Sequence, residues 1–218
     1  DSGVVVSDLF GINDVALDFL IEDDGKIVVS GYSNIVNKVG FAISRYHSDG
    51  SIDTDFDKGK ICSAASPTIN NAKDIVLQDD GKICYAGVSL GNPAVARLMP
   101  GGLVDSAFGN NGLSVIASAV SWVINSIAIQ LDQKILCAGY VPQKFCVVRL
   151  NPDGVTDSTF GINGAAFSEY YSGSVYARSM ALQSDGKIIV AGDIQDRIAV
   201  MRFLSDGTLD NSFGINGV

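Results

Sequence analysis

Residues 149–161 read RLNPDGVTDSTFG and residues 181–192 read ALQSDGKIIVAG, and related segments return at a regular spacing along all 218 residues. The arginine, the aspartate and the phenylalanine of the first segment each occur four times. They are Arg45, Arg97, Arg149 and Arg202; Asp53, Asp105, Asp157 and Asp210; and Phe56, Phe108, Phe160 and Phe213. The arginines and the phenylalanines both step by 52, 52 and 53 residues. This fixed period indicates four tandem copies of one structural unit.

Each copy contains short runs of apolar or alternating residues, which predict β-strands. In the fourth copy these runs are MALQ (180–183), KIIVAG (187–192) and AVMRF (199–203). An Asp-Gly turn joins the first two runs, and this dipeptide is a strong hairpin signal. A weaker fourth run follows the FGxNG segment, as in AAFSEY (165–170). Four antiparallel strands repeated at this period predict a propeller blade, whereas solenoid repeats are usually shorter.

We therefore expect an all-β fold, a β-propeller of four antiparallel four-stranded blades in a single domain spanning residues 1–218. The expected repeats are residues 1–61, 62–113, 114–165 and 166–218. The segment GVVVS (3–7) has the pattern of the fourth strand that the last copy needs. It is expected to complete the last blade and so close a four-bladed ring. In the second arrangement, the chain is half of an eight-bladed ring that a second copy completes. A fragment of a larger propeller is the third arrangement that fits the pattern.

The repeat resembles the delta-60 repeat, a β-propeller repeat of bacterial proteins with the pattern ALQxDGKIxVAG…xARLNxDGxLDxSFG. Residues 181–192, 149–161 and 204–214 match this pattern closely. Asp57 departs from it, since the other copies have Gly109, Gly161 and Gly214 there. The resemblance implies a propeller fold and a secreted or cell-surface bacterial protein, with a cytoplasmic location left open. It implies no active site, because no catalytic role is attached to the family.

The charge balance argues against nucleic acid as a partner. The chain carries 15 Lys and Arg against 24 Asp and Glu, a net charge of −9, which repels phosphate backbones and anionic membrane surfaces. No apolar run approaches the ~20 residues that span a bilayer, so we expect no membrane insertion. The four cysteines occupy apolar strand positions or their margins, which favours small buried hydrophobes over disulfides. These are Cys62, Cys84, Cys137 and Cys146.

The repeated polar residues are best interpreted as structural. An arginine within an apolar strand needs a partner, and the aspartate eight residues later can supply it. The first copy adds Asp49, Asp55 and Asp57 to Asp53, a carboxylate density that could suit calcium, but the ligand spacing is loose. His47 lies beside a turn without a nucleophile motif. We accordingly predict no metal, no cofactor and no catalytic residue.

Residues that break the repeat are the better candidates for binding. Trp122, Tyr170, Tyr171 and Tyr176 precede the first strands of the third and fourth copies. Aromatic side chains beside small polar residues suit glycan or peptide recognition, although they could equally pack the edges of blades. The sequence therefore predicts a non-catalytic binding or scaffold module for a protein or glycan partner. The alternatives are a glycan hydrolase or lyase with carboxylates near the central channel, and a purely structural spacer.

Overall fold

The structure is a computed structural model that describes residues 3–9, 13–35, 38–59, 61–62, 69, 72–116, 122–215 and 217. Its strands form four antiparallel sheets in chain order, which we call blades 1 to 4. Blade 1 consists of β1 (Asp14–Ile21), β2 (Ile27–Ile35), β3 (Lys38–Tyr46) and β4 (Ile61–Cys62). Blade 2 consists of β5 (Ala72–Leu77), β6 (Ile83–Ser89), β7 (Asn92–Leu98) and β8 (Leu113–Val115).

Blade 3 consists of β9 (Val123–Ile129), β10 (Ile135–Val141), β11 (Lys144–Leu150) and β12 (Ala165–Phe167). Blade 4 has three strands in the described residues, β13 (Val175–Leu182), β14 (Ile188–Ile194) and β15 (Arg197–Phe203). The helix η1 (Asp57–Gly59) is a short 3-10 turn. The chain therefore forms an all-β propeller fold with one blade for each sequence repeat.

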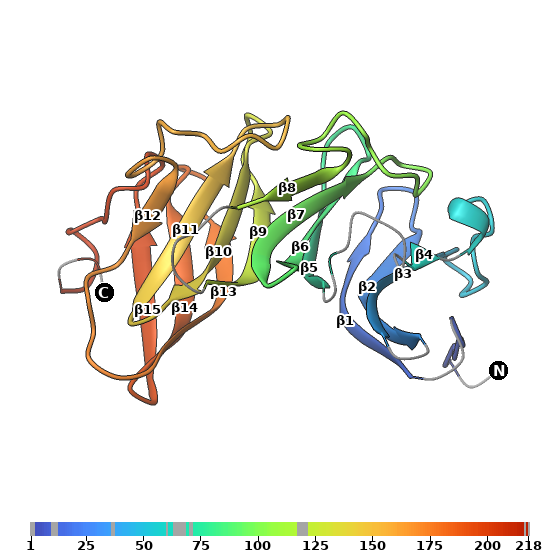
Figure 1. Cartoon of the computed structure of the whole chain (residues 1–218), viewed down its shortest axis with the longest axis horizontal. Coiled ribbons are helices and arrows are strands. Elements are labelled where there is room, and N and C mark those ends of the chain that lie inside the picture. Colours follow the sequence, from blue (N-terminus) through green and yellow to red (C-terminus); the bar gives the residue numbers. More distant parts are fainter. Residues whose placement is uncertain are drawn as a thin grey trace.

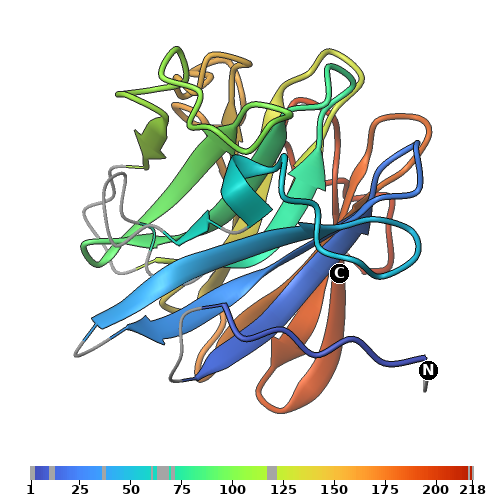
Figure 2. The same cartoon turned by 90° about the vertical axis from the view of Figure 1, so that its right-hand side faces the viewer.

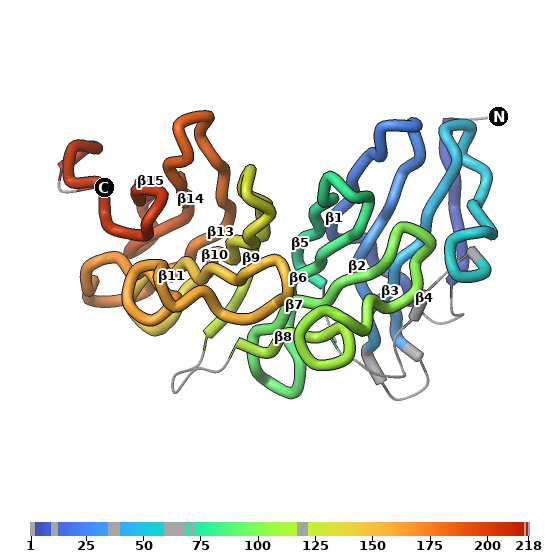
Figure 3. The backbone as a smooth tube through the Cα atoms, turned by 90° about the horizontal axis from the view of Figure 1, so that it is seen from above, coloured from blue at the N-terminus to red at the C-terminus, as the bar shows by residue number. Residues whose placement is uncertain are grey.

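The blades follow one another along an arc. Their first strands, β1, β5, β9 and β13, lie side by side on its concave side, and each contacts the next. The two ends of the described chain lie at opposite ends of the long axis (Figure 1), and the view from above shows the same open arrangement (Figure 3). The four blades thus form part of a ring, in which neighbouring blades contact each other and blades 1 and 4 do not.

Local chemistry explains the strands and their turns. The turn between β13 and β14 has Gly186 at φ +82, and the backbone N–H of Lys187 donates to Asp185 Oδ1 at 3.2 Å. At the other end of the second strand, a Cβ on Gly139 would lie 1.8 Å from the carbonyl oxygen of Val123. Glycine is required there because β9 and β10 approach too closely for any side chain, at a bulge in their register.

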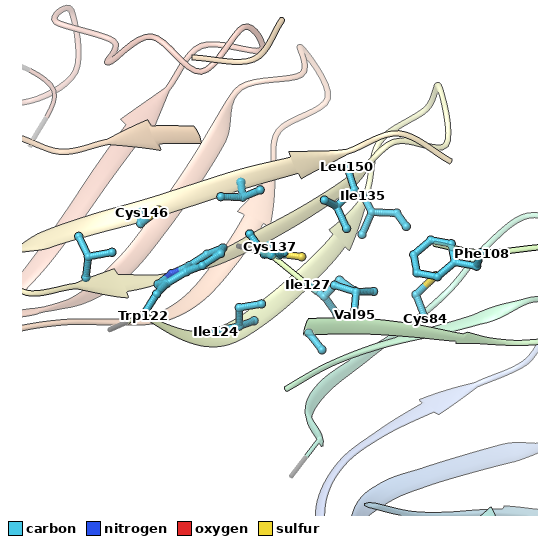
Figure 4. Close-up of a cluster of buried hydrophobic side chains, with 14 residues drawn as sticks. Cys84, Val95, Phe108, Trp122, Ile124, Ile127, Ile135, Cys137, Cys146 and Leu150 are labelled. Atoms are coloured by element: carbon cyan, nitrogen blue, oxygen red, sulfur yellow. The ribbon is translucent and has the colours of Figure 1, made fainter. Parts of the chain in front are cut away.

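The hydrophobic cores lie between blades rather than within them. Blades 1 and 2 share a cluster in which Phe41 and Tyr85 stack, with ring centroids 4.0 Å apart. A second cluster joins blades 2 and 3 (Figure 4), and a third joins blades 3 and 4. Burying each large apolar side chain contributes about 1.5–3 kcal/mol, so every blade depends on its neighbours. Cys84, Cys137 and Cys146 are free thiols in the second cluster; the side chain of Cys62 lies outside the described residues.

The N-terminal segment does not close the ring. Residues 3–9 run along blade 1 (Figure 2), where the side chain of Val5 lies against Gly50. In the described residues no strand pairs with the outer edge of β15. The intramolecular closure that the pattern of Gly3–Ser7 had suggested is therefore absent, because the arc keeps blades 1 and 4 apart.

Candidate functional site

The repeated arginine, aspartate and phenylalanine form the same small cluster in every blade. In blade 3, Arg149 Nε donates to Asp157 Oδ2 at 2.7 Å, and the guanidinium lies 4.6 Å from the ring centroid of Phe160. The corresponding hydrogen bonds of the other blades measure 2.8, 2.9 and 2.8 Å. Burial alone would raise the pKa of Asp157, but hydrogen bonds from Thr159 and Lys134 and the charge of Arg149 hold it well below its usual range.

The same arginines also join one blade to the next. Arg149 Nη1 donates to the carbonyl oxygen of Ser205 in blade 4 at 2.8 Å, and Arg45 Nη1 donates to Pro100 of blade 2 at the same distance. A backbone hydrogen bond of 2.8 Å from Gly161 to Asp206 runs beside the first contact. These clusters hold the blades together, which is a structural role.

Two carboxylates of the first copy, Asp49 and Asp53, accept hydrogen bonds within turns. Asp49 Oδ1 accepts the backbone N–H of Ser51 at 2.8 Å, and Asp53 Oδ1 accepts that of Asp55 at 3.0 Å. His47 lies at 3.9 Å from Asp53 and is partly exposed. Within the described part of the chain, no three His, Cys, Asp or Glu side chains gather in a way that could hold a metal ion.

Trp122 lies inside the core. Its side chain is 5% exposed and packs in the cluster between blades 2 and 3, near Ile124 and Cys137 (Figure 4). The indole therefore has the packing role that the sequence had left as the alternative, and its surface is not accessible to a ligand in this structure.

Two of the three tyrosines of the sequence prediction, Tyr171 and Tyr176, lie at the boundary of blades 3 and 4. Tyr176 on β13 meets Tyr140 of β10 edge to face, with ring centroids 5.0 Å apart and planes at 88°. Tyr171 is partly buried, and its backbone N–H donates to the carbonyl oxygen of Gln143 at 3.0 Å. Tyr170 is exposed in the segment that leads into blade 4.

A hollow of about 390 Å³ opens beside the rings of Tyr140 and Tyr176. We call it the aromatic groove, and its lining comprises Val123, Tyr140, Pro142, Gln143, Gly173, Ser174, Val175 and Tyr176. The loop between β10 and β11 forms one side of it, and the connection from blade 3 to blade 4 forms the other. Sequence reasoning found Tyr176 and missed Tyr140 and Gln143, because these lie on a strand and loop of the preceding repeat.

Charge and hydrogen bonds fix the rim of the aromatic groove. Arg178 lies 4.9 Å from the ring centroid of Tyr176, and its Nε donates to Asp193 Oδ1 at 2.9 Å. The backbone N–H of Gln195 donates to the carbonyl oxygen of Ser174 at 2.9 Å, which ties the connection to the next loop. Aromatic faces with amide and hydroxyl groups around them can bind a sugar ring or a peptide.

Two acidic residues lie on the concave side of the arc. Asp18 Oδ2 accepts the backbone N–H of Ile75 at 2.9 Å, and Asp74 Oδ2 accepts that of Ile127 at 2.8 Å. Burial, together with a hydrogen bond that the protonated Asp74 donates to the Asp18 carboxylate, raises the pKa of Asp74 to about 6. Each carboxylate thus anchors the first strand of the next blade, and Ser126 holds the same position in blade 3, where it binds the N–H of Met180 at 3.3 Å.

Four segments of the chain match a family of β-propeller repeats described as a domain of unknown function, DUF5122. They are residues 22–56, 78–108, 130–160 and 183–213. The chain belongs to this family. Each matched segment starts at the turn after the first strand of a blade and ends at the repeated phenylalanine, so the matches follow the blades one by one.

Comparison with solved structures returns the extracellular domain of a one-component system from B. thetaiotaomicron. The sequence identity is 10% and the TM-score 0.45, over 83% of this chain and 21% of that chain. The chain therefore spans about a fifth of that protein's structure, and a likeness of this degree carries no information on function. No curated protein matches the sequence. No helix in the described residues is long and apolar enough to cross a membrane.

Proposed function

We propose that the protein is a non-catalytic binding or scaffold module that presents the aromatic groove to a glycan or a peptide segment of a protein. The observation that carries this proposal is the edge-to-face pair of Tyr140 and Tyr176 beside a hollow of about 390 Å³. Rings held in this way offer apolar surface at little entropic cost, because packing already fixes their rotamers.

The surroundings of the aromatic groove support recognition rather than bond cleavage. No carboxylate is among the described residues that line it, and Asp193 at its rim is held by Arg178. Hydrolysis of a glycosidic bond normally needs two carboxyl groups on either side of the bond. Asp18 and Asp74, on the concave side, bind backbone N–H groups and so are engaged in structure. The groups that line the aromatic groove are donors, acceptors and apolar rings, which is the composition of a binding site.

A glycan and peptide array probed with the wild-type chain and with Tyr176→Ala and Tyr140→Ala tests this proposal. We expect either substitution to weaken binding at least tenfold, because each removes one ring of the pair. Tyr32→Ala is the matched control, since Tyr32 holds in blade 1 the position of Tyr140 in blade 3. Equal binding by all four proteins, or release of reducing sugar from a bound glycan, would contradict the proposal.

The finer family and location are also proposals. The match of ALQSDGKIIVAG (181–192) to the delta-60 pattern supports assignment to that repeat. The same resemblance supports a bacterial protein that acts at the cell surface or after secretion. Fractionation of the native host, with detection by an antibody against the chain, would show in which compartment the protein lies. Recovery in the cytoplasm would contradict the proposed cell-surface or secreted location.

A further inference from the structure

Both ends of the arc are incomplete copies of the interface that joins the blades inside it. A four-blade arc has three internal boundaries, and at each of them one blade packs a face on the opposite face of the next blade. The outer faces of blades 1 and 4 have no such neighbour in the described residues. We define the trailing face as Ile198, Val200, Arg202 and Phe213 of blade 4. The leading face is Phe19, Ile21, Val29 and residues 48–50 of blade 1.

The trailing face lacks the partners that its equivalents have. Arg202 binds Asp210, but in the described part of the chain its Nη1 has no acceptor, whereas Arg149 Nη1 binds Ser205. Ile198 is 92% exposed. The residue at the same position in blade 3, Phe145, is fully buried against the next blade.

The leading face supplies what is missing. Ser48 and Asp49 hold in blade 1 the positions of Ser205 and Asp206, whose carbonyl oxygens accept hydrogen bonds from blade 3. Within the described residues the carbonyl oxygens of Ser48 and Asp49 accept none. Phe19 is 63% exposed, although its counterpart in blade 2, Ile75, is buried.

The N-terminal segment already lies where a fourth strand belongs. In blade 2, Ser114 of the fourth strand donates to the carbonyl oxygen of Gly154, in the turn of the next blade, at 2.6 Å. Val5 contacts Gly50, the equivalent of Gly154, in the turn of blade 1. The segment is thus positioned as the fourth strand of a blade that would precede blade 1.

We propose that a second copy of this chain fills both gaps. The trailing face of each copy packs on the leading face of the other. Residues 5–7 of one copy pair with the outer edge of β15 in the other, beyond Gly217, which already binds the N–H of Arg202 as Gly112 binds that of Arg97. Two such contacts, related by a twofold axis, close a ring of eight blades, which is within the usual range of about four to eight. The proposal is independent of the aromatic groove.

The solution mass of the wild-type chain, measured by light scattering across a range of concentrations, is the first test. We expect twice the 22.8 kDa of one chain, because both contacts of a closed ring form together. A mass of one chain at every concentration would overturn the proposal. So would a series of larger, concentration-dependent assemblies, since these indicate contacts that do not close.

Substitutions at the two faces test the arrangement. Ile198→Asp and Phe19→Asp should each halve the mass, because a buried charge is placed in both contacts of the ring. Leu131→Asp is the matched control; Leu131 is 99% exposed on a turn away from both faces, and the dimer should persist. Thermal unfolding of each variant establishes that it is folded.

Mixing the two monomeric variants distinguishes this arrangement from a symmetric contact of like faces. Ile198→Asp keeps an intact leading face and Phe19→Asp keeps an intact trailing face, so the mixture should regain a two-chain species through one contact. If Phe19→Asp alone still forms a wild-type dimer, the pairing of unlike faces is wrong.

A disulfide test addresses the exchanged strand. Val95 and Ser114 face each other across β7 and β8, and the equivalent pair in the proposed dimer is Val200 of one copy and Val5 of the other. In a Cys62→Ser background, the double variant Val5→Cys/Val200→Cys should oxidise to a covalent two-chain species. Val5→Cys/Leu131→Cys should not, and equal crosslinking of both would contradict strand exchange.

Discussion

Arg149 donates to the carbonyl oxygen of Ser205, 56 residues further along the chain, while its Nε binds Asp157 of its own blade. One side chain therefore connects a turn, a ring and a neighbouring blade. Because Arg45 and Arg97 do the same toward Pro100 and Pro152, the repeat carries its own means of joining to the next copy. The blades depend on these contacts as well as on the apolar clusters between them.

Replacing the repeated arginine should lower the free energy of unfolding most in a blade that is followed by another blade. Arg149→Ala removes the bond to the buried Asp157 carboxylate and the bond to Ser205 of the next blade, although Lys134 still pairs with Asp157. We expect a loss of about 3 kcal/mol in the free energy of unfolding. Arg202→Ala should cost less, because Arg202 has no contact to a following blade in the described residues. Urea unfolding of both variants in the Ile198→Asp background makes the comparison, and equal losses would contradict a role in joining blades.

The glycine at the end of the second strand should not tolerate a side chain. A Cβ on Gly139 would lie 1.8 Å from the Val123 carbonyl oxygen, so Gly139→Ala should destabilise the protein by more than about 4 kcal/mol. Gly101→Ala is the control, since no atom lies within 4 Å of its Cβ position and its φ is not positive. Thermal unfolding of the two variants checks this, and similar melting temperatures would refute it.

The Asp74 carboxyl should make stability depend on pH in the mildly acidic range. Its pKa is about 6 in the folded protein against 3.8 for an ordinary aspartate. The folded state then holds the proton more tightly, so stability is greatest below about pH 4 for this group and declines as the pH rises to about 6. The repeated Asp–Arg pairs have the opposite effect, a loss of stability as the pH falls. That loss occurs only below the ordinary pKa of aspartate, because the pKa values of Asp157 and Asp210 are depressed in the folded protein.

Asp74→Asn should remove that decline. The asparagine oxygen can still accept the N–H of Ile127 and its amide can donate to Asp18, so the variant should be more stable above pH 6 by on the order of 1 kcal/mol. Urea unfolding of wild type and variant between pH 4 and pH 8 measures the effect. A variant that is less stable at pH 7, with the same pH slope as wild type, would contradict it.

The buried thiols should be chemically silent until the protein unfolds. Burial raises the pKa values of Cys84 and Cys146 to about 12 and that of Cys137 further still, so almost no thiolate exists at neutral pH. In a Cys62→Ser background, an aromatic disulfide reagent should react with no thiol of the folded chain and with three after addition of denaturant. Rapid reaction of the folded variant would contradict the packing of the cluster between blades 2 and 3.

The repeat predicted most of what lies within a blade. The period set by Arg45, Arg97 and their equivalents locates each sheet. The Asp-Gly turns locate the first hairpin of blades 1, 2 and 4, and in blade 3 Gln133 takes the glycine position with φ +64. Both follow from short-range patterns, in which strand alternation and turn chemistry act over a few residues. The sequence also placed the arginine within reach of the aspartate eight residues later, since a hairpin brings those positions together.

Contacts between blades were harder to predict. That Arg149 reaches Ser205, that Trp122 is buried, and that Tyr140 meets Tyr176 all depend on how one sheet packs on the next. The open arc depends on the same packing, because a small change in the angle between blades accumulates over four copies. Single-sequence patterns contain no direct signal for that angle.

The most direct test of the open arc is the distance between labels at its two outer faces in the monomer. Phe19→Cys and Ile198→Cys can be labelled selectively in the Cys62→Ser background, because the other thiols are buried, and the labels themselves would block the contact between copies. Spin-label distance measurement at dilute concentration should give a single long distance, matching the separation of blades 1 and 4 across the arc (Figure 3). A short distance, equal to that between neighbouring blades, would show a closed four-bladed ring and contradict the account.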